Sequence, residues 1–170
     1  MRSCRAIAYF LLIVTFLTTS SCQNESKESA NQSIAKGKEN TALKSLPNSA
    51  FLAEITMLKE IPKAMMARGT YDISAKVKNI SQEKWPAGRY DYHVKLGYRW
   101  LDLGNNLLKA EGPGILPKDL SPGEEMDLSF KITAFEKAGE YYLILDMYQE
   151  KVCWFSDKGS SAKKFLIKVE

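Results

Sequence analysis

The chain from Phe51 onward is built of short segments in which apolar and polar residues alternate. Residues that alternate with period two lie on opposite faces of a β-strand, so each segment predicts a strand with one buried and one exposed face. Clusters of Gly, Pro, Asn and Asp separate the segments at intervals of about ten to fifteen residues, which is typical of an antiparallel sandwich or barrel. The expected strands are 51–58, 71–78, 93–100, 107–110, 126–132, 142–145 and 164–169.

Two of these segments predict contrasting environments. Apolar residues alternate most regularly from Met126 to Ile132, so one face of this strand should be buried and the other solvated. The segment 142–145 is more continuously apolar, which predicts a strand buried on both faces. Between the strands, Pro113-Gly114 and 117–123 are expected to form a long crossing loop.

Composition and charge exclude several classes of function. The 170 residues are 45% hydrophobic and 26% charged, which is ordinary for a globular protein with one sizeable core. The formal net charge of +4 is modest for this length and argues against a dedicated nucleic-acid binder. The single histidine and three scattered cysteines leave no ligand cluster for zinc and no disulfide framework, so we predict no metal and no cofactor.

The first 21 residues have the layout of a secretory signal peptide. Arg2 and Arg5 form a basic head, an apolar run follows over 6–17, and small residues fill 18–21. The apolar run is shorter than the roughly 20 residues that a helix needs to span a bilayer. We therefore expect residues 1–21 to be removed rather than to remain as a membrane helix.

The four residues Thr19-Ser20-Ser21-Cys22 resemble the lipobox of bacterial lipoproteins, although Thr19 stands where leucine is usual. The resemblance implies that Cys22 becomes the acylated N-terminus, and two or more acyl chains anchor a protein stably. Gln23 follows in place of aspartate, which in Gram-negative lipoproteins implies transfer to the outer membrane. The domain would then face either the periplasm or the cell surface. The alternative is an ordinary signal peptide cleaved nearby, with Cys22 a chance cysteine.

Residues 22–49 are expected to form a flexible linker. They are rich in Ser, Asn, Lys and Glu, lack aromatic residues and show no hydrophobic periodicity. A coil of this length has a root-mean-square reach of roughly 30 Å, enough to hold a small domain clear of lipid headgroups. Residues 50–170 then form one domain.

Several short segments of this domain carry a family resemblance. These segments are Val77–Ser81, Trp85–Gly88, Val94–Trp100, Glu111–Gly112, Leu116–Pro117, Leu120–Glu124, Gly139–Leu143, Leu145–Glu150 and Trp154–Phe155. In their order and spacing they resemble an immunoglobulin-like bacterial module that occurs alone or fused to glycosyltransferases, methyltransferases and polysaccharide-export proteins. The module is also similar to four-tryptophan domains. The resemblance implies an immunoglobulin-like antiparallel β-sandwich of about seven strands, and it implies neither one ligand nor a catalytic residue.

Four aromatic residues are candidates for ligand binding, because the CH face of a sugar ring stacks on Trp or Tyr. Trp85 and Tyr90 lie at the edge of a strand beside Pro86 and Gly88, where Trp85 either closes the open end of the sandwich or offers a ligand platform. Trp154 and Phe155 are expected in the turn before the last strand and are the first choice for an exposed patch.

Other aromatic residues are expected in the core. Tyr98, Trp100 and Phe130 are in phase with aliphatic residues of their strands.

The remaining residues give little indication of a catalytic site. His93 is expected on a strand surface and has no partner for a triad. The carboxylates of 124–127 lack the spacing of a calcium loop, and a solvated strand face accounts for them better. Cys153 is either a reactive thiol or a small buried residue. We therefore expect a protein that is not an enzyme.

These observations together predict a membrane-anchored lipoprotein with a non-catalytic binding module. The expected ligand is a cell-envelope glycan or a partner protein. The alternative is a structural or assembly accessory that docks another envelope protein through a sheet edge. A glycan site predicts an exposed aromatic pair beside amide or carboxylate groups, whereas protein docking predicts a broader apolar patch or an open edge strand.

Overall fold

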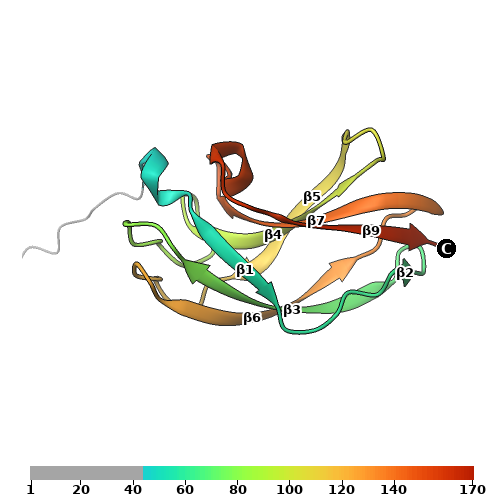
Figure 1. Cartoon of the computed structure of the whole chain (residues 1–170), viewed down its shortest axis with the longest axis horizontal. Coiled ribbons are helices and arrows are strands. Elements are labelled where there is room, and N and C mark those ends of the chain that lie inside the picture. The colour runs from blue at the N-terminus through green and yellow to red at the C-terminus, as the bar shows by residue number, and fades with distance from the viewer. Residues whose placement is uncertain (1–43) are drawn as a thin grey trace, which may run out of the picture. The chain divides into compact units, whose positions relative to one another are not determined.

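The computed structural model describes residues 44–170, so the predicted signal peptide, Cys22 and most of the predicted linker lie outside the described residues (Figure 1). None of the helices described is long and apolar enough to cross a membrane. The strands are β1 (Ala53–Met57), β2 (Ala64–Met65), β3 (Thr70–Asn79), β4 (Val94–Leu101), β5 (Leu107–Ile115), β6 (Glu125–Thr133), β7 (Gly139–Gln149), β8 (Cys153–Trp154) and β9 (Lys163–Val169). Two 3₁₀ turns, η1 (Asn48–Ala50) and η2 (Phe155–Lys158), complete the described elements.

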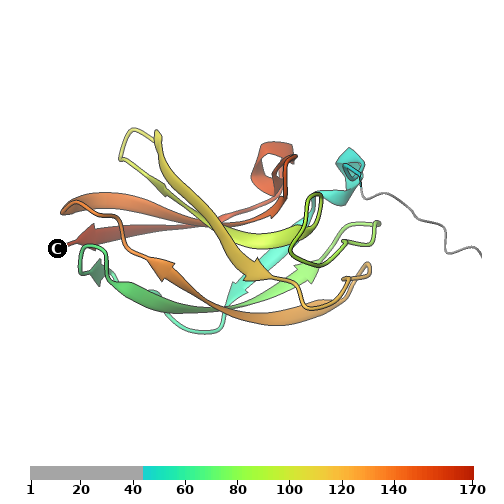
Figure 2. The ribbon, with the colours of Figure 1, turned by 180° about the vertical axis from the view of Figure 1, so that it is seen from behind.

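The strands form two sheets that lie one above the other (Figure 1). The three-stranded sheet has the order β1-β3-β6, and the larger sheet has the order β2-β9-β7-β4-β5, with β8 paired to β7. All named strand pairs are antiparallel except the short parallel pair of β2 with β9. Seen from behind, β5 runs across the view from a projecting hairpin toward the smaller sheet (Figure 2). The predicted β-sandwich is confirmed.

Alternation of side chains places the core between the sheets. In the smaller sheet, Ile73 lies opposite Phe130 and Ala75 opposite Leu128, and all four are buried. The outward residues of β6 are exposed or half-buried, as the regular alternation over 126–132 predicts. This agreement follows from the position of β6, whose outer face has only solvent beyond it.

The larger sheet contributes the aromatic part of the core. Tyr98 of β4 lies opposite Leu145 of β7, and Trp100 lies opposite Leu143. Tyr98 and Trp100 have no exposed surface, which confirms that they belong to the core. The indole N–H of Trp100 donates to the carbonyl of Thr133 on the other sheet at 3.0 Å, so its polar atom is satisfied.

The continuously apolar segment of β7 is buried on both faces from Leu143 to Leu145, as expected, whereas Tyr142 at its start is half-buried. Residues 143–147 are all buried, including Asp146. β7 lies inside the larger sheet, and after a turn at Lys151 the chain folds back beside it as β8 and η2. This return of the chain forms one side of the candidate functional site.

The expected crossing loop is shorter than predicted, because Pro113 and Gly114 lie within β5. β5 is an edge strand, where a proline without an N–H need not disturb the sheet. Gly114 lies directly against Leu96 of β4, where a Cβ atom would come within 2.7 Å of the Leu96 carbonyl. Sequence reasoning treated both residues as breakers, whereas their position at an edge allows the strand to continue.

Candidate functional site

Two of the four candidate residues, Trp85 and Phe155, are part of the core. Neither has exposed surface. The indole N–H of Trp85 donates to the carbonyl of Ala50 in η1 at 2.8 Å. The Phe155 ring packs edge-on against Trp85 and Phe51, with ring centroids 5.1 Å apart in both pairs. The expected exposed pair of Trp154 and Phe155 is therefore wrong for Phe155, because η2 directs this side chain into the core.

Tyr90 is the most exposed of the candidates, with 80% of its surface accessible. It lies in the loop before β4, and the structure does not bring it to the pocket that Trp154 lines. The nearby His93 was expected on the surface, and this expectation is wrong. His93 is buried, and its Nδ1 lies 3.1 Å from the amide nitrogen of Tyr90, because the loop folds over the imidazole ring.

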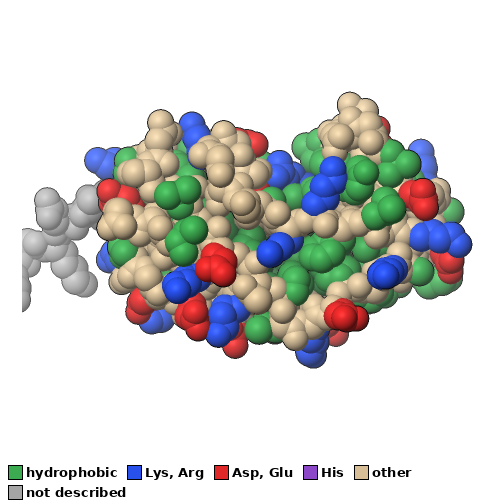
Figure 3. All heavy atoms as spheres, viewed as in Figure 1, with side chains coloured by type: hydrophobic (Ala, Val, Ile, Leu, Met, Phe, Trp, Pro, Cys, Tyr) green, Lys and Arg blue, Asp and Glu red, His purple; other side chains and the backbone are tan. Residues whose placement is uncertain are grey.

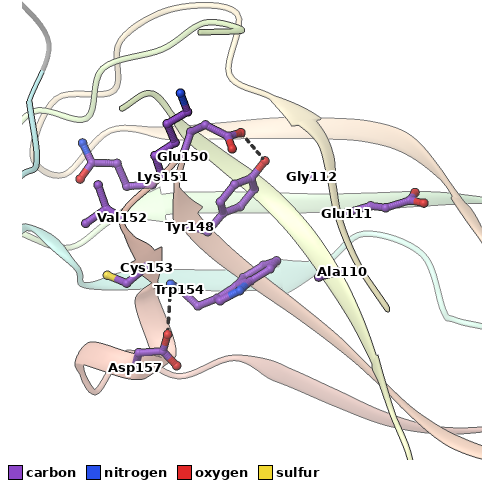
Figure 4. Close-up of a pocket in the computed structure, with 11 residues that line it drawn as sticks. Ala110, Glu111, Gly112, Tyr148, Glu150, Lys151, Val152, Cys153, Trp154 and Asp157 are labelled. Carbon is purple, nitrogen blue, oxygen red and sulfur yellow. Dashed lines mark hydrogen bonds between the residues drawn. The ribbon is translucent and has the colours of Figure 1, made fainter. Parts of the chain in front are cut away.

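Trp154 lines an open pocket of about 590 Å³ on the outer face of the larger sheet (Figure 4). The end of β7, the following turn and β8 form one side, and β5 forms the other. The lining residues are Ala110, Glu111, Gly112, Tyr148, Gln149, Glu150, Lys151, Val152, Cys153, Trp154 and Asp157.

The main feature of this pocket is a pair of aromatic rings. Tyr148 of β7 lies opposite Trp154 of β8, with ring centroids 4.8 Å apart and planes inclined at 37°. Both side chains are partly exposed. The sequence analysis did not single out Tyr148, because it continues an apolar strand. We call these two rings the aromatic pair.

Two glycines make room for the aromatic pair on the sheet. A Cβ atom on Gly97 of β4 would come within 2.8 Å of the Trp154 ring, and one on Gly112 of β5 would overlap the Tyr148 ring. Real Cβ atoms do not approach other atoms this closely, so a side chain at either position would displace a ring. Gly97 within an expected strand was a signal, since a glycine inside a strand can mark a place where another group approaches closely.

A buried ion pair lies beneath Trp154. The Arg99 guanidinium is 4.5 Å from the centroid of the indole and donates hydrogen bonds at 2.9 Å to both Asp146 and the hydroxyl of Ser156. Burial raises the pKa of Asp146 above its ordinary value, and hydrogen bonds from Ser156 and the charge of Arg99 oppose this effect. The ion pair joins β4, β7 and η2, so it fixes the floor of the pocket.

Glu150 supplies a carboxylate at the upper edge of the aromatic pair. It accepts hydrogen bonds from Lys95 at 2.6 Å and from the Tyr148 hydroxyl at 3.2 Å (Figure 4). The hydrogen bond from Lys95 lowers the pKa of Glu150, so this group is ionised at neutral pH. Burial raises the pKa of Tyr148 well above its ordinary value, so its phenol remains protonated.

Asp157 supplies a second carboxylate on the opposite side of the rings, and it is exposed. It accepts the backbone N–H of Trp154 at 3.3 Å (Figure 4). Glu111, in contrast, points away from the pocket and accepts a hydrogen bond from the core phenol of Tyr98. Lys151, the lysine of the lining, is paired with Asp91 at 2.7 Å. A ligand in the pocket would therefore meet the two rings, the Asp157 carboxylate and the Glu150 carboxylate, which is already paired with Lys95.

This arrangement is suited to binding a polar ligand with an apolar face. Residues 44–170 contain no group of three His, Cys, Asp or Glu side chains that could hold a metal ion. Burial raises the pKa of the Cys153 thiol, so this residue is protonated at neutral pH and a weak nucleophile. The pocket thus offers stacking surfaces and hydrogen-bond acceptors.

Comparison with known proteins finds likenesses among solved structures alone. No family model and no curated protein sequence matches the chain. The fold is similar to the CARDB domain of the PF1109 protein from Pyrococcus furiosus, solved in complex with di-metal ions (18% identity, 70% of this chain, 86% of that chain, TM-score 0.41). It is also similar to the C-terminal domain of wzt (13% identity, 69% and 70%, TM-score 0.44).

A β-glucosidase from Listeria innocua, solved in complex with glucose, contains a similar region (15% identity, 69% of this chain, TM-score 0.43). The match spans only 16% of that enzyme. These likenesses concern the fold alone. The chain is an immunoglobulin-like β-sandwich, as the sequence predicted.

Proposed function

We propose that this protein is a lipid-anchored, non-catalytic module that binds a cell-envelope glycan at the aromatic pair. The observation that supports the proposal is the position of Tyr148 and Trp154 in an open pocket, 4.8 Å apart and flanked by carboxylates. An aromatic pair of this kind beside acceptor groups is the arrangement expected of a glycan site.

The aromatic pair and the carboxylates have complementary roles in this proposal. The CH faces of a pyranose ring pack on Trp154 and Tyr148, while Glu150 and Asp157 accept hydrogen bonds from hydroxyl groups. The rings are positioned by Gly97 and Gly112, so little ordering is left for the binding step. A site preorganised in this way loses less conformational entropy when it binds.

The charges of the pocket favour a neutral sugar or an amino sugar. Among the lining residues Asp157 is a carboxylate without a lysine partner, whereas Glu150 is paired with Lys95 and Lys151 with Asp91. A phosphorylated or uronic sugar would meet like charges in a site of reduced dielectric. We therefore expect acidic glycans to bind weakly.

The proposed anchor brings the module to the envelope. Acylation of Cys22 would hold the chain at the membrane, and Gln23 favours the outer membrane. The flexible linker predicted after Cys22 would have a reach of roughly 30 Å, which would allow the pocket to search for nearby glycans. A partner protein is the other class of ligand proposed for this module.

A glycan array tests the proposal. The full chain, purified in a detergent without a sugar headgroup, is applied to neutral, amino and acidic envelope glycans, alongside the variants Trp154→Ala, Tyr148→Ala and Tyr90→Ala. We expect saturable binding to a neutral or amino sugar. Loss of either ring of the aromatic pair should weaken it at least tenfold, since stacking of a nucleic-acid base on one aromatic ring contributes about 1–3 kcal/mol and we expect a similar contribution for a sugar face.

Tyr90→Ala is the matched control, because it removes an exposed tyrosine that does not line the pocket. Its binding should equal that of the unaltered chain. Absence of binding across the array would contradict the proposal. Binding that is lost with Tyr90→Ala and retained with Trp154→Ala would place the site in the loop before β4 instead.

A further inference from the structure

Strand β9 has an open edge along most of its length. It pairs with β7 from Lys163 to Val169, but on its other side β2 pairs only with Lys168 and Val169. The segment 163–167 therefore has a strand partner on one side alone. An unpaired edge of this kind can accept an added strand.

The hydrogen bonds of β9 show which backbone groups face the open edge. The N–H of Lys168 donates to Lys63 and the N–H of Glu170 donates to Met65, both on the side of β2. Backbone groups of alternate residues point in the same direction along a strand. The N–H and C=O groups of Lys164 and Leu166 consequently face the open edge, while those of Phe165 face β7.

An apolar groove lies beside this edge. It has a volume of about 690 Å³ and includes Met57, Ile61, Phe165, Leu166 and Ile167 among its lining residues. Figure 3 shows a hydrophobic area between β9 and the connection from β1 to β2, with Lys or Arg side chains around it. An added strand would find backbone partners at the edge and apolar contacts in the groove.

The described part of the chain does not itself supply a strand along this open edge. The segment between β1 and β2 runs beside the groove, but Pro62 has no N–H to donate and restricts Ile61 before it. Among the described residues the connection joins this edge from Lys63 to Met65, beside the last residues of β9.

The charges at the open edge favour an acidic partner. Segment 163–169 contains Lys163, Lys164 and Lys168 and no acidic residue, although Lys168 is paired with Glu170. The groove itself is lined by Lys63, Lys164 and one carboxylate, Glu60, so the positive charges outnumber the negative one. The same charges oppose pairing of β9 with β9 of a second copy, because the two segments would repel each other. An extended segment carrying carboxylates would instead form favourable cross-strand pairs.

We propose that the open edge of β9 binds an extended segment of a partner protein in which acidic and apolar residues alternate. The apolar side chains enter the groove, and the acidic side chains meet the lysines. The open edge spans 163–167 and ends where β2 begins. An added strand rises about 3.3 Å per residue, as β9 does, so about five of its residues fit. This interaction uses a surface separate from the aromatic pair.

A phage library of random decapeptides tests this inference. The library is selected on the full chain in detergent and on the variant Leu166→Pro. This variant loses an edge-facing N–H but no hydrogen bond to β7, and proline is tolerated at such an edge. We expect the unaltered chain to enrich alternating acidic and apolar sequences, and the variant to enrich none of them.

A charge-reversal pair provides a test that does not alter the backbone. Lys63→Glu with Lys163→Glu should weaken binding of an enriched peptide at least tenfold, whereas Arg89→Glu with Lys137→Glu, of equal charge change at exposed positions, should not.

Hydrogen exchange should slow at the amides of Lys164 and Leu166 when the peptide binds and remain unchanged at Phe165. Failure to enrich any sequence, or binding that all variants retain, would overturn the inference. Glycan binding is measured on the same variants and should be unaffected.

Discussion

Gly97 and Gly112 determine where the aromatic pair lies, because each leaves space that a ring atom occupies. The Trp154 ring in turn covers the buried ion pair of Arg99 with Asp146. At the scale of residues, then, the pocket depends on two positions without side chains as much as on two aromatic rings. A missing Cβ atom has a functional consequence here because the neighbouring rings are the proposed ligand surface.

Substitution of one glycine tests this dependence. Gly112→Ala should displace the Tyr148 ring and weaken glycan binding at least tenfold, with a loss of about 1–3 kcal/mol in the free energy of unfolding from overpacking. Urea unfolding and glycan titration measure the two effects. Gly104→Ala in the exposed hairpin before β5 is the control, since its Cβ would contact only nearby polar side chains at 3.1 Å or more. Unchanged glycan binding by Gly112→Ala would contradict the role given to Tyr148.

Single residues also show the limits of sequence reasoning at the site. Trp154 was singled out by its expected place in a turn, whereas the structure places it in β8, where it lines the pocket. Its partner Tyr148 was not singled out, because a strand residue facing outward has the same pattern whether solvent or another ring covers it. Phe155 follows Trp154 directly and yet is buried. Which of two adjacent aromatic residues faces the core depends on the 3₁₀ turn η2, and no periodicity predicts such a turn.

At the scale of elements, the site exists because the chain returns along the outer face of the larger sheet. β8 and η2 follow β7 and bring Trp154 and Ser156 over β4 and β7. The ion pair of Arg99 with Asp146 connects these elements at a place where little water is present. We therefore expect it to control both the stability of the fold and the geometry of the pocket.

Removal of one partner of this ion pair tests that role. Arg99→Met leaves Asp146 buried without its counter-charge and should lower the free energy of unfolding at pH 7 by about 3–5 kcal/mol. The pKa of Asp146, already raised by burial, should rise further. A carboxyl whose pKa is higher in the folded state stabilises the fold at low pH and loses that contribution as pH rises through the folded pKa.

The variant should therefore recover part of its stability, relative to the unaltered chain, when the pH is lowered from 7 toward 5. Denaturant unfolding at several pH values measures this recovery. Asp146→Asn with Arg99→Met removes the titrating carboxyl and is the control, which should show no such recovery. A constant difference between Arg99→Met and the unaltered chain across this range would show that Asp146 is not responsible.

The strands themselves could be predicted where one face meets solvent, and less well where both faces are covered. β6 and β9 follow the expected alternation, because their outward residues are exposed. β4 has an outward face of Lys95, Gly97 and Arg99 that was read as solvated, but Lys95 and Gly97 are buried. β8, the turn at Lys151 and the aromatic pair cover this face. These contacts come from a later part of the chain, so the alternation of residues within β4 does not predict them.

At the scale of the molecule, the described residues form a compact unit with one core between two sheets. The first residues described are attached to this unit, since Gln149 accepts the N–H of Leu46 at 2.9 Å and donates to the carbonyl of Lys44 at 3.0 Å. The proposed anchor at Cys22 lies before them, outside the described residues. Anchoring and ligand binding are therefore expected to depend on separate parts of the chain.

The variant Cys22→Ser tests the anchor. In a Gram-negative host we expect the unaltered chain in the outer-membrane fraction and labelled by radioactive palmitate. The variant should lose the label and leave that fraction, because no thiol remains at the acylation position. Cys153→Ser is the control and should behave as the unaltered chain does. Palmitate labelling that survives Cys22→Ser would contradict the proposed lipid site.

The central claim is that the aromatic pair binds a glycan, and tryptophan fluorescence tests it most directly. Trp85 and Trp100 have no exposed surface, whereas Trp154 is partly exposed, so acrylamide should quench chiefly the emission of Trp154. We predict that the glycan bound most tightly on the array protects this emission from acrylamide in a saturable manner, and that Trp154→Phe abolishes the protected signal. A glycan that binds at the same concentration without protecting Trp154 would contradict the account.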